Sequence, residues 1–409
     1  MKKFQVPKKK TIHNALLILG IIFVAFNLRP AITSVGPLIG LIREDLGISN
    51  GVAGFITTLP LLSFAFLSIL APKLGQLLGN ERTIFFGLIA LFIGIIIRST
   101  GLAFTLFLGT ALVGIGVAIG NVLLPSILKL NFPTRVGIMT SVYTTSMNTF
   151  AGLGSGISFP LAQGLELGWQ KALGTWGVLA LIAIIIWVPQ LQHKQKPSTT
   201  VNFIPSSKSI WSSPLAWQVT IFMGLQSFLF YSTVAWFPEI LESNGMDLSL
   251  AGWMLSLMQL VGLPTTFFAP MLASRFRNQK GIVIIVGLFY FIGITGFLLN
   301  INPSLIIVSI ILIGMAQGAS ISLALTLIGM RSTNAQQAAN LSGMAQSIGY
   351  LLAAIGPILI GFLFDQTHSW TVPLVVLSLV TVVMIVAGLG AGRNQYVISP
   401  TEKDTRIPQ

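Results

Sequence analysis

The sequence of 409 residues contains no cysteine and only three histidines. Without cysteine, the chain has no disulfide, no thiolate nucleophile and no cysteine metal site. The histidines, His13, His193 and His368, fall in or near expected loops, so a redox cofactor held by a pair of buried histidines is disfavoured. We therefore expect no cofactor and no metal site.

Charged residues are also scarce. The chain has 23 Lys and Arg and 10 Asp and Glu, together 8% of its residues, whereas soluble proteins have about 25%. So few charges cannot cover the surface of a soluble fold of this length, and 54% hydrophobic residues exclude disorder. The composition therefore excludes a soluble enzyme and predicts a protein that is solvated by a lipid bilayer.

The N-terminus, MKKFQVPKKK followed by apolar residues, superficially resembles a secretory signal. The apolar run from Ala15 to about Leu41 is too long for such a signal, and no small-residue cleavage site ends it. We expect this run to be an uncleaved first membrane helix.

Long apolar segments follow one another along the whole chain, and a spanning helix needs about 20 apolar residues. This criterion predicts an all-α polytopic membrane protein with twelve transmembrane helices in two six-helix halves. The halves are expected at 1–190 and 216–392, with a cytoplasmic linker at 191–215 and a cytoplasmic tail at 393–409. The predicted spans are 14–40, 51–71, 83–100, 103–125, 136–163, 171–190, 216–239, 250–271, 281–299, 304–330, 337–364 and 370–392.

The basic residues fall mainly on one side of this arrangement. With a cytoplasmic N-terminus, the cytoplasmic side collects 19 of the 23 Lys and Arg residues, and seven of the ten acids lie outside. Cytoplasmic loops of membrane proteins carry such an excess. The net charge of +13 therefore reports topology, and we expect both termini in the cytoplasm and no nucleic-acid partner.

The two halves share short sequences at similar spacings. Ala53-Gly54 recurs as Ala251-Gly252, and Ala71-Pro72 recurs as Ala269-Pro270, both at an offset of 198. These matches indicate a duplicated six-helix unit, the plan of transporters that bind a solute between two halves.

Arg29 lies about midway along the first predicted span, where a charge costs about 2.5–3.5 kcal/mol. Such a residue normally faces a wet cavity and meets an anion. The alternative is a partner within the bundle, such as helix-end carbonyl groups or an acid not recognised in the sequence. No Asp, Glu, Lys or His is expected well inside a span, so intramembrane proteolysis and a proton relay through a buried carboxylate are disfavoured.

Other polar residues on the predicted helices are candidates for the wall of a solute cavity. Each of them could instead form a hydrogen bond between helices. The candidates for substrate binding, together with Arg29, are Thr33, Asn121, Asn148, Gln346 and Tyr350.

Several motifs resemble the major facilitator superfamily, within it the branch of cyanate and 2-nitroimidazole transporters. They are Asn27-Leu28-Arg29-Pro30 with Val35-Gly36-Pro37, TTLPLLSFAFLSILAPKLGQLLGNER, GIGVAIGNVLLPSILK, YTTSMN and LSGMAQSIGYLLAAIGP. The resemblance covers essentially the whole chain. It implies alternating access around a central site with Arg29 in its wall, gating roles for Arg82 and Arg275, and a bacterial inner or plasma membrane.

The chain departs from the superfamily pattern at its usual charged loops. After the second helix, Gln76 and Leu77 replace the usual acid and base, and after the eighth, Ser274 replaces the acid while Arg275 is kept. The usual inward gate is therefore expected to be weak. The glycine-rich signature of nitrate porters is also missing, which disfavours that kind of nitrate transport.

The sequence leaves several functions open. The first is a secondary transporter, expected as a monomer, for a small anion or weak acid such as cyanate or a small organic anion. The second is an exporter of flat nitro-aromatic or drug-like compounds such as 2-nitroimidazoles. A receptor or a channel is weaker, because the chain has no extra sensory sequence and its two-fold repeat favours alternating access. No enzyme activity is expected, and the absence of a P-loop disfavours ATP hydrolysis.

Overall fold

The computed structural model describes the chain except residues 1–7, 133–135, 193–207, 300–302, 334 and 399–409. The described part is almost entirely helical and contains no strand. Its first half comprises α1 (Lys8–Leu28), α2 (Pro30–Thr33), η1 (Gly36–Leu38), α3 (Ile39–Leu46), α4 (Asn50–Leu78), α5 (Asn80–Arg98), α6 (Ala103–Asn131), α7 (Val136–Phe159), η2 (Pro160–Gly164), α8 (Gly168–Gly174), α9 (Trp176–Trp187) and η3 (Val188–Gln192).

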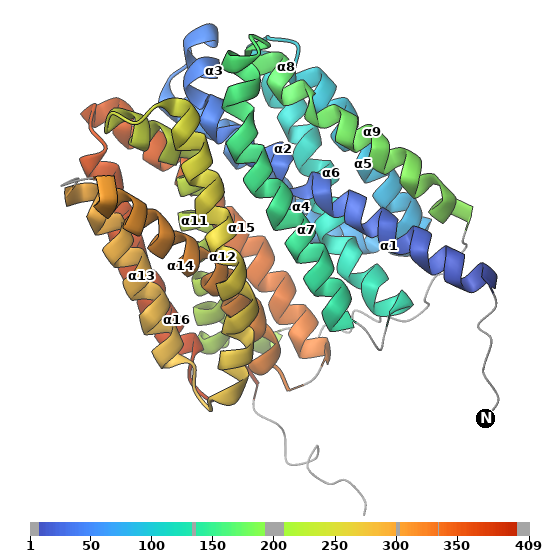
Figure 1. The fold of residues 1–409 in the computed structure, drawn as a ribbon. Coiled ribbons are helices and arrows are strands. Elements are labelled where there is room, and N and C mark those ends of the chain that lie inside the picture. The colour runs from blue at the N-terminus through green and yellow to red at the C-terminus, as the bar shows by residue number, and fades with distance from the viewer. Residues whose placement is uncertain (1–7, 133–135, 193–207, 300–302, 334, 399–409) are drawn as a thin grey trace, which may run out of the picture.

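The second half of the chain continues with longer, less interrupted helices. They are α10 (Lys208–Trp211), α11 (Pro214–Ser243), α12 (Leu248–Arg275), α13 (Lys280–Leu299), α14 (Pro303–Met330), α15 (Ala335–Thr367) and α16 (Thr371–Ala391). Figure 1 shows α1–α9 and α11–α16 as two groups of helices side by side. The predicted linker lies mostly outside the described residues, apart from α10 and the residues beside it, and most of the predicted tail lies outside them too.

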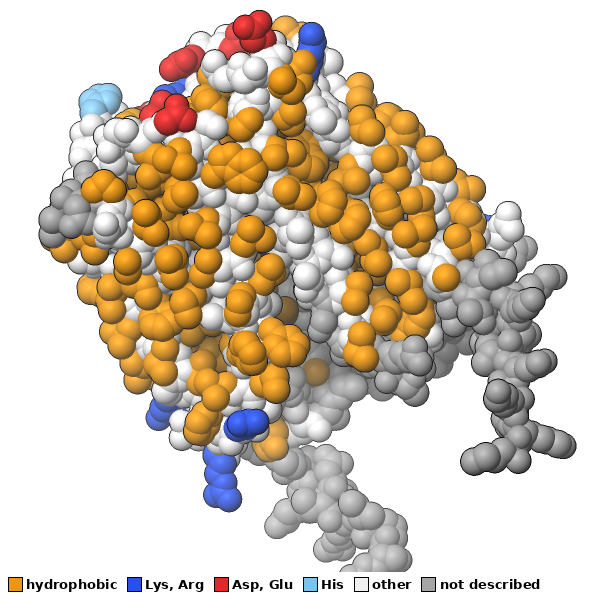
Figure 2. Space-filling model, viewed as in Figure 1, with side chains coloured by type: hydrophobic (Ala, Val, Ile, Leu, Met, Phe, Trp, Pro, Cys, Tyr) orange, Lys and Arg blue, Asp and Glu red, His pale blue; other side chains and the backbone are white. Residues whose placement is uncertain are grey.

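Eleven helical segments of the described part are long and apolar enough to cross a membrane. The helix α7 is not among them, although its 24 residues lie where the fifth span is predicted. Its sequence carries Ser, Thr and Asn residues, which lower its apolar character. Large apolar side chains cover the outside of both groups, as expected for surfaces that face lipid (Figure 2).

The sequence repeat corresponds to a structural repeat. The helices α4 and α12 begin at Asn50 and Leu248, which are 198 residues apart, the offset of the repeated motifs. Both begin at a side-chain cap, because Ser49 accepts a hydrogen bond from the backbone of Val52 and Asp247 from Ser249 and Leu250. Such caps satisfy backbone donors that the first turn of a helix leaves free.

The first predicted span is not one helix, which corrects the sequence prediction. The helix α1 ends at Leu28, and the chain continues through α2 and η1 before α3 begins. Pro30 has no backbone donor and disfavours a regular helical conformation of Arg29, and Gly36-Pro37 weakens the next turn. Arg29 accordingly has φ −112° and ψ −46°. The Arg29 side chain therefore extends from a break in the first span.

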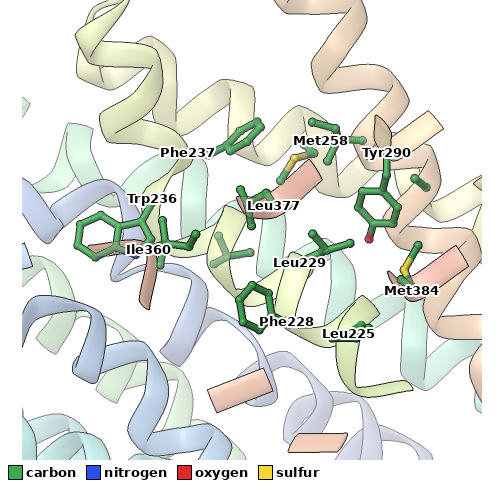
Figure 3. Close-up of a cluster of buried hydrophobic side chains, with 14 of the residues drawn as sticks. Leu225, Phe228, Leu229, Trp236, Phe237, Met258, Tyr290, Ile360, Leu377 and Met384 are labelled. Carbon is green, nitrogen blue, oxygen red and sulfur yellow. The ribbon is translucent and has the colours of Figure 1, made fainter. Parts of the chain in front are cut away.

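The described residues form two buried apolar clusters, one mainly in each helix group, and the cluster of the second group continues into first-group residues such as Ile39 and Ile56. Figure 3 shows the core of the second group, where Phe228 and Leu229 of α11 pack near Met258, Tyr290 and Leu377 from three other helices. Aromatic and long aliphatic side chains supply most of the buried area in such cores. Buried apolar side chains therefore hold each group together and also join the two groups where the cluster continues.

The two groups meet mainly through α4 with α15, and α7 with α12. The contacts gather towards one end, the acidic end, where Figure 2 shows the Asp and Glu side chains. Here Thr58 of α4 donates a hydrogen bond to the carbonyl of Ala354, and Gln259 of α12 donates to Ser155 of α7. Towards the opposite, basic end the groups diverge and the surface is hollowed between them (Figures 1 and 2).

Candidate functional site

Arg29 is half-buried at the break between α1 and α2. Its backbone carbonyl accepts hydrogen bonds from the amides of Ile32 and Thr33, which anchors the short helix that follows. Its guanidinium group lies over the ring of Phe230 of α11, with Cζ 4.8 Å from the ring centroid. A cation in this position is attracted by the negative face of the ring.

Three tyrosines lie within electrostatic range of the Arg29 guanidinium. Its charge acts electrostatically on the phenol groups of Tyr143 on α7, Tyr231 on α11 and Tyr350 on α15. The ring of Tyr231 meets that of Phe230 edge to face at 5.0 Å. Both helix groups therefore contribute to one aromatic site around a single cation, which we call the Arg29 site: Arg29, Tyr143, Phe230, Tyr231 and Tyr350.

Asn121 supports this site from α6. Its Oδ1 accepts a hydrogen bond of 2.9 Å from the Tyr143 hydroxyl, while its Nδ2 donates to the carbonyl of Val117. Asn121 thus orients Tyr143 towards the Arg29 region. While the Tyr143 hydroxyl donates its hydrogen bond to Asn121, its oxygen can still accept one. If the hydroxyl rotates, it can donate to a solute instead.

The other predicted binding residues are less directly placed. Thr33 is only 1% exposed, and its hydroxyl donates to the carbonyl of Ala151 at 2.9 Å, so it fixes α2 to α7. Gln346 is half-buried and donates to Ser342 one turn away, and Asn148 is half-buried on α7. In this conformation Thr33 is a structural residue. Among the described residues, neither Gln346 nor Asn148 forms a hydrogen bond with Arg29.

Arg82 and Arg275, the predicted gating residues, are exposed at the start of α5 and the end of α12. Neither forms an ion pair among the described residues. The acidic end, by contrast, is held by charged side chains. Arg43 Nη1 of α3 lies 3.6 Å from Glu239 Oε2 of α11, so this ion pair joins the two helix groups.

A second polar contact closes the same end. Asp365 of α15 accepts hydrogen bonds from the backbone amides of Asn50 (3.1 Å) and Gly51 (2.8 Å), and from the side chain of Asn50. The carboxylate of one group thus caps the N-terminus of α4 in the other, where the helix dipole favours a negative charge. The acidic end is closed by two charge-assisted contacts.

The fold buries three charged residues that the sequence alone does not single out. Arg98 is 0% exposed, Arg331 is 1% exposed and Glu239 is 7% exposed. Each stands at or near the end of a helix, where sequence suggests a residue at the membrane surface. Arg98 packs against Gly109 of α6, Arg331 donates a hydrogen bond to the carbonyl of Ala391, and Glu239 lies against Arg43.

Tyr143 and Phe230 were not predicted as site residues. Tyr143 belongs to the YTTSMN motif, and Phe230 precedes a tyrosine on α11. An aromatic residue on an apolar helix usually packs against lipid or a neighbouring helix, so no sequence signal separates these two from the other aromatic residues. Their role depends on which helices face Arg29.

Among the described residues, no group of three or more His, Asp and Glu side chains could hold a metal ion. The Arg29 site combines one cation, three phenols and a ring face. Such a site can bind a small solute by charge, hydrogen bonding and stacking.

Known proteins of one family match almost the whole length of the chain. The sequence profile of the Major Facilitator Superfamily matches residues 17–354 and 238–405. The chain belongs to the Major Facilitator Superfamily. It is therefore a multi-pass membrane transporter for a small-molecule substrate and not an enzyme.

Relatives within the superfamily cover nearly the whole chain. The chain is 60% identical to the uncharacterized transporter YycB of Bacillus subtilis strain 168 over 96% of its length and 97% of the relative. It is 40% identical to the 2-nitroimidazole transporter of Escherichia coli K12 over 94% and 97%, and 25% identical to the cyanate transport protein CynX of the same strain over 83% and 88%. The resemblance inferred from the motifs is confirmed.

Solved structures show the same fold. A mutant of the nucleoside transporter NupG superposes with a TM-score of 0.76 at 14% identity, covering 92% of this chain and 99% of that one. A D-xylose-proton symporter gives 0.72 at 13%, covering 91% and 97%. The two helix groups, with α7 of the first group added to the eleven apolar spans, thus form the superfamily fold, so the predicted fold class is confirmed.

Removing the Tyr143 hydroxyl is expected to weaken solute binding about three- to tenfold, because a hydrogen bond contributes about 0.5–1.5 kcal/mol. The Tyr143→Phe variant also releases Asn121, so the apparent affinity for solute changes while the protein remains folded. Solute binding to purified protein measures the effect. Tyr290→Phe is the matched control, since Tyr290 bonds Ser320 at 3.3 Å in the core of the second group. Equal effects of both variants would contradict a role for Tyr143 in the site.

Replacing Arg43 with leucine is expected to destabilise the protein more than replacing Arg43 and Glu239 together. The single variant leaves Glu239 buried without its cation, whereas the double Arg43→Leu, Glu239→Leu variant removes both charges. We expect a coupling of about 0.5–3 kcal/mol in a double-mutant cycle of thermal unfolding. Arg277→Leu, at an exposed position, serves as the control. Additive effects would show that the ion pair does not stabilise the closed acidic end.

Proposed function

We propose that this chain is a secondary active transporter that moves a small anion or weak acid by alternating access. The observation that supports it is the Arg29 site, where a half-buried cation lies between the two helix groups. No carboxylate of the described part forms an ion pair with Arg29. A cation in this setting favours a solute that brings the missing negative charge.

The aromatic lining favours a planar solute. Guanidinium presents a flat fork of donors that matches the two oxygens of a carboxylate, and the phenols of Tyr231 and Tyr350 supply further hydrogen-bond donors. Cationic solutes are disfavoured beside Arg29. We propose that Arg29 binds the charged end, and that Asn121, through Tyr143, helps to orient the solute.

The asymmetry of the interface supports alternating access. The acidic end is closed by the contacts of Arg43 and Asp365, while the basic end is hollowed. We propose that the basic end is cytoplasmic, following the excess of Lys and Arg there. The conformation would then be open to the cytoplasm of a bacterial inner membrane, with the two halves rocking about the Arg29 site in each monomer.

A second candidate is export of flat nitro-aromatic compounds. It is supported by the 40% identity to a 2-nitroimidazole transporter and by the ring of Phe230 below Arg29. A nitro group presents two planar oxygens, as a carboxylate does, so the same guanidinium fork could bind it without a full charge. The two candidates therefore differ in the charge of the solute and in the direction of transport.

Purified protein reconstituted into liposomes separates them. Liposomes are loaded with unlabelled cyanate, benzoate or 2-nitroimidazole, and exchange with the labelled solute outside is measured. Exchange of cyanate or benzoate above that of empty liposomes supports the anion transporter. Exchange restricted to 2-nitroimidazole supports the second candidate, and exchange of a cationic solute alone would overturn both.

A further inference from the structure

Arg98 is a second cation in the first helix group, away from the Arg29 site. It ends α5, is 0% exposed, and its Nη1 donates a hydrogen bond of 2.6 Å to the carbonyl of Ala31. Its Nε and Nη2 have no hydrogen-bond partner among the described residues. A buried guanidinium in this state is costly, because a buried donor left unpaired costs about 1–3 kcal/mol and more when charged.

Other buried donors without partners belong to the segments that meet at the end of α5. Ser34 follows the α2 turn that contains Ala31, and its hydroxyl is 0% exposed and unpaired within the described part. Thr110 is also unpaired and follows Gly109, where an added Cβ would lie 2.7 Å from Arg98 Cβ. The α2 turn and α6 both pack on Arg98, and each carries an unpaired hydroxyl.

Trp176 adds an indole donor from α9. Its Nε1 is buried and unpaired in the described structure. It lies between Gly174 and Gly177, where an added Cβ would be 3.4 Å from Ser99 and from Ile95 of the α5 end. The α2 turn, α6 and α9, which all pack on the last turns of α5, therefore each carry an unpaired donor besides those of Arg98.

Arg98, Ser34, Thr110 and Trp176 together have more hydrogen-bond donors than acceptors, and the positive charge of Arg98 has no negative partner among the described residues. The nitrogens of Arg98 and Trp176 only donate hydrogen bonds. The hydroxyls of Ser34 and Thr110 can accept only some of the hydrogen bonds that these nitrogens offer. A water molecule would accept from Arg98 but would need acceptors for its own hydrogens and would leave the charge uncompensated. The ion pair found in the described part is that of Arg43 with Glu239, so no carboxylate there neutralises Arg98.

We propose that Arg98, with Ser34, Thr110 and Trp176, forms a buried binding site for a small monovalent anion of the size of chloride. The anion accepts from Nε and Nη2 of Arg98 and neutralises its charge. It also ties α5 to the turn at Ala31, two residues after Arg29, and so keeps the break in the first span in place. The site is distinct from the Arg29 site and stands without the proposed function.

Binding of radioactive chloride to purified wild-type protein, with gluconate replacing chloride at constant ionic strength, tests this site. We expect saturable binding and a higher midpoint of thermal unfolding in chloride than in gluconate. The Arg98→Gln variant is expected to lose both effects. The Arg29→Gln variant is expected to keep chloride binding and the higher thermal midpoint, because it alters only the Arg29 site. In this variant, competition by excess cyanate tests whether the Arg98 site also binds the proposed solute.

Variants that leave Arg98 in place guard against loss of folding. Ser34→Ala and Thr110→Val each remove one donor, and together they are expected to raise the half-saturating chloride concentration at least about tenfold, as loss of hydrogen bonds to a charged group does. Thr220→Val, a buried hydroxyl in the second helix group, is the matched control. Equal thermal midpoints in chloride and gluconate without saturable binding, or unchanged chloride affinity in the double variant, would overturn the proposal.

Discussion

Arg29→Gln is expected to reduce transport about 30- to 1,000-fold in reconstituted liposomes, which corresponds to about 2–4 kcal/mol of lost interaction with a charged solute. Arg29 is the cation of the site, and Phe230 and the tyrosines cannot replace its charge. Glutamine keeps part of the side-chain length and its hydrogen-bonding amide. The loss therefore reports the charge and the guanidinium fork, not the volume of the residue.

Two further variants separate these properties. Arg29→Lys keeps the charge without the planar fork, so intermediate transport is expected for a carboxylate or nitro solute. Arg277→Gln removes an exposed arginine and is expected to transport normally. Normal transport by inserted Arg29→Gln protein would show that Arg29 does not bind solute. If the solute is neutral, the loss of transport is expected to fall to the size of one lost hydrogen bond.

Most of the fold follows from the sequence because the membrane restricts the alternatives. Apolar length alone places both bounds of α5 and α11–α16 within four residues of those observed, whereas α4 and α6 extend seven and six residues beyond their predicted ends. The offset of 198 also predicts that α4 and α12 begin at equivalent positions. The break at Arg29 was not predicted as a break, although Pro30 indicates it, because apolar length does not show where a helix is interrupted.

The candidate site was predicted less completely. Arg29 is visible in the sequence because a charge in an apolar run has a high cost. Tyr350 and Asn121 are polar enough to be noticed, and the structure places Tyr350 by Arg29 and Asn121 on Tyr143. Phe230 differs from other phenylalanines only by the helix face that it occupies.

The rotation of each helix decides the rest. Thr33 shares a helical face with Arg29 by spacing, but the break in the first span turns it towards Ala151. Arg98 is at the end of an apolar run and would reach water if α5 stood alone. Its burial results from packing against α6 at Gly109 and against the α2 turn, which involve residues far apart in the sequence.

Gly54→Trp is expected to abolish transport by preventing closure of the acidic end. A Cβ on Gly54 of α4 would lie 2.7 Å from the carbonyl carbon of Pro357 on α15, which is backbone and cannot move as a flexible side chain does. A tryptophan there would force the two helix groups apart at this end. Inserted protein should be folded but held in the conformation that is open at the acidic end.

Cysteine labelling measures this change directly, because the natural chain has no cysteine. A single cysteine replaces Thr58, which is 2% exposed and bonds Ala354 across the interface. In Gly54→Trp protein this cysteine is expected to react at least about tenfold faster with a membrane-impermeant maleimide applied outside intact cells. Gly343→Trp on α15, where an added Cβ meets nothing within 4 Å, is the control.

The reagent also tests the orientation of the chain. Faster labelling from outside requires that the acidic end faces outwards and that the two helix groups separate there. Faster labelling only in inverted membranes would reverse the proposed orientation while keeping the closure. Unchanged labelling on both sides, with transport retained, would show that the contact at Gly54 yields to a bulky side chain. Closure of the acidic end would then not depend on close packing at Gly54.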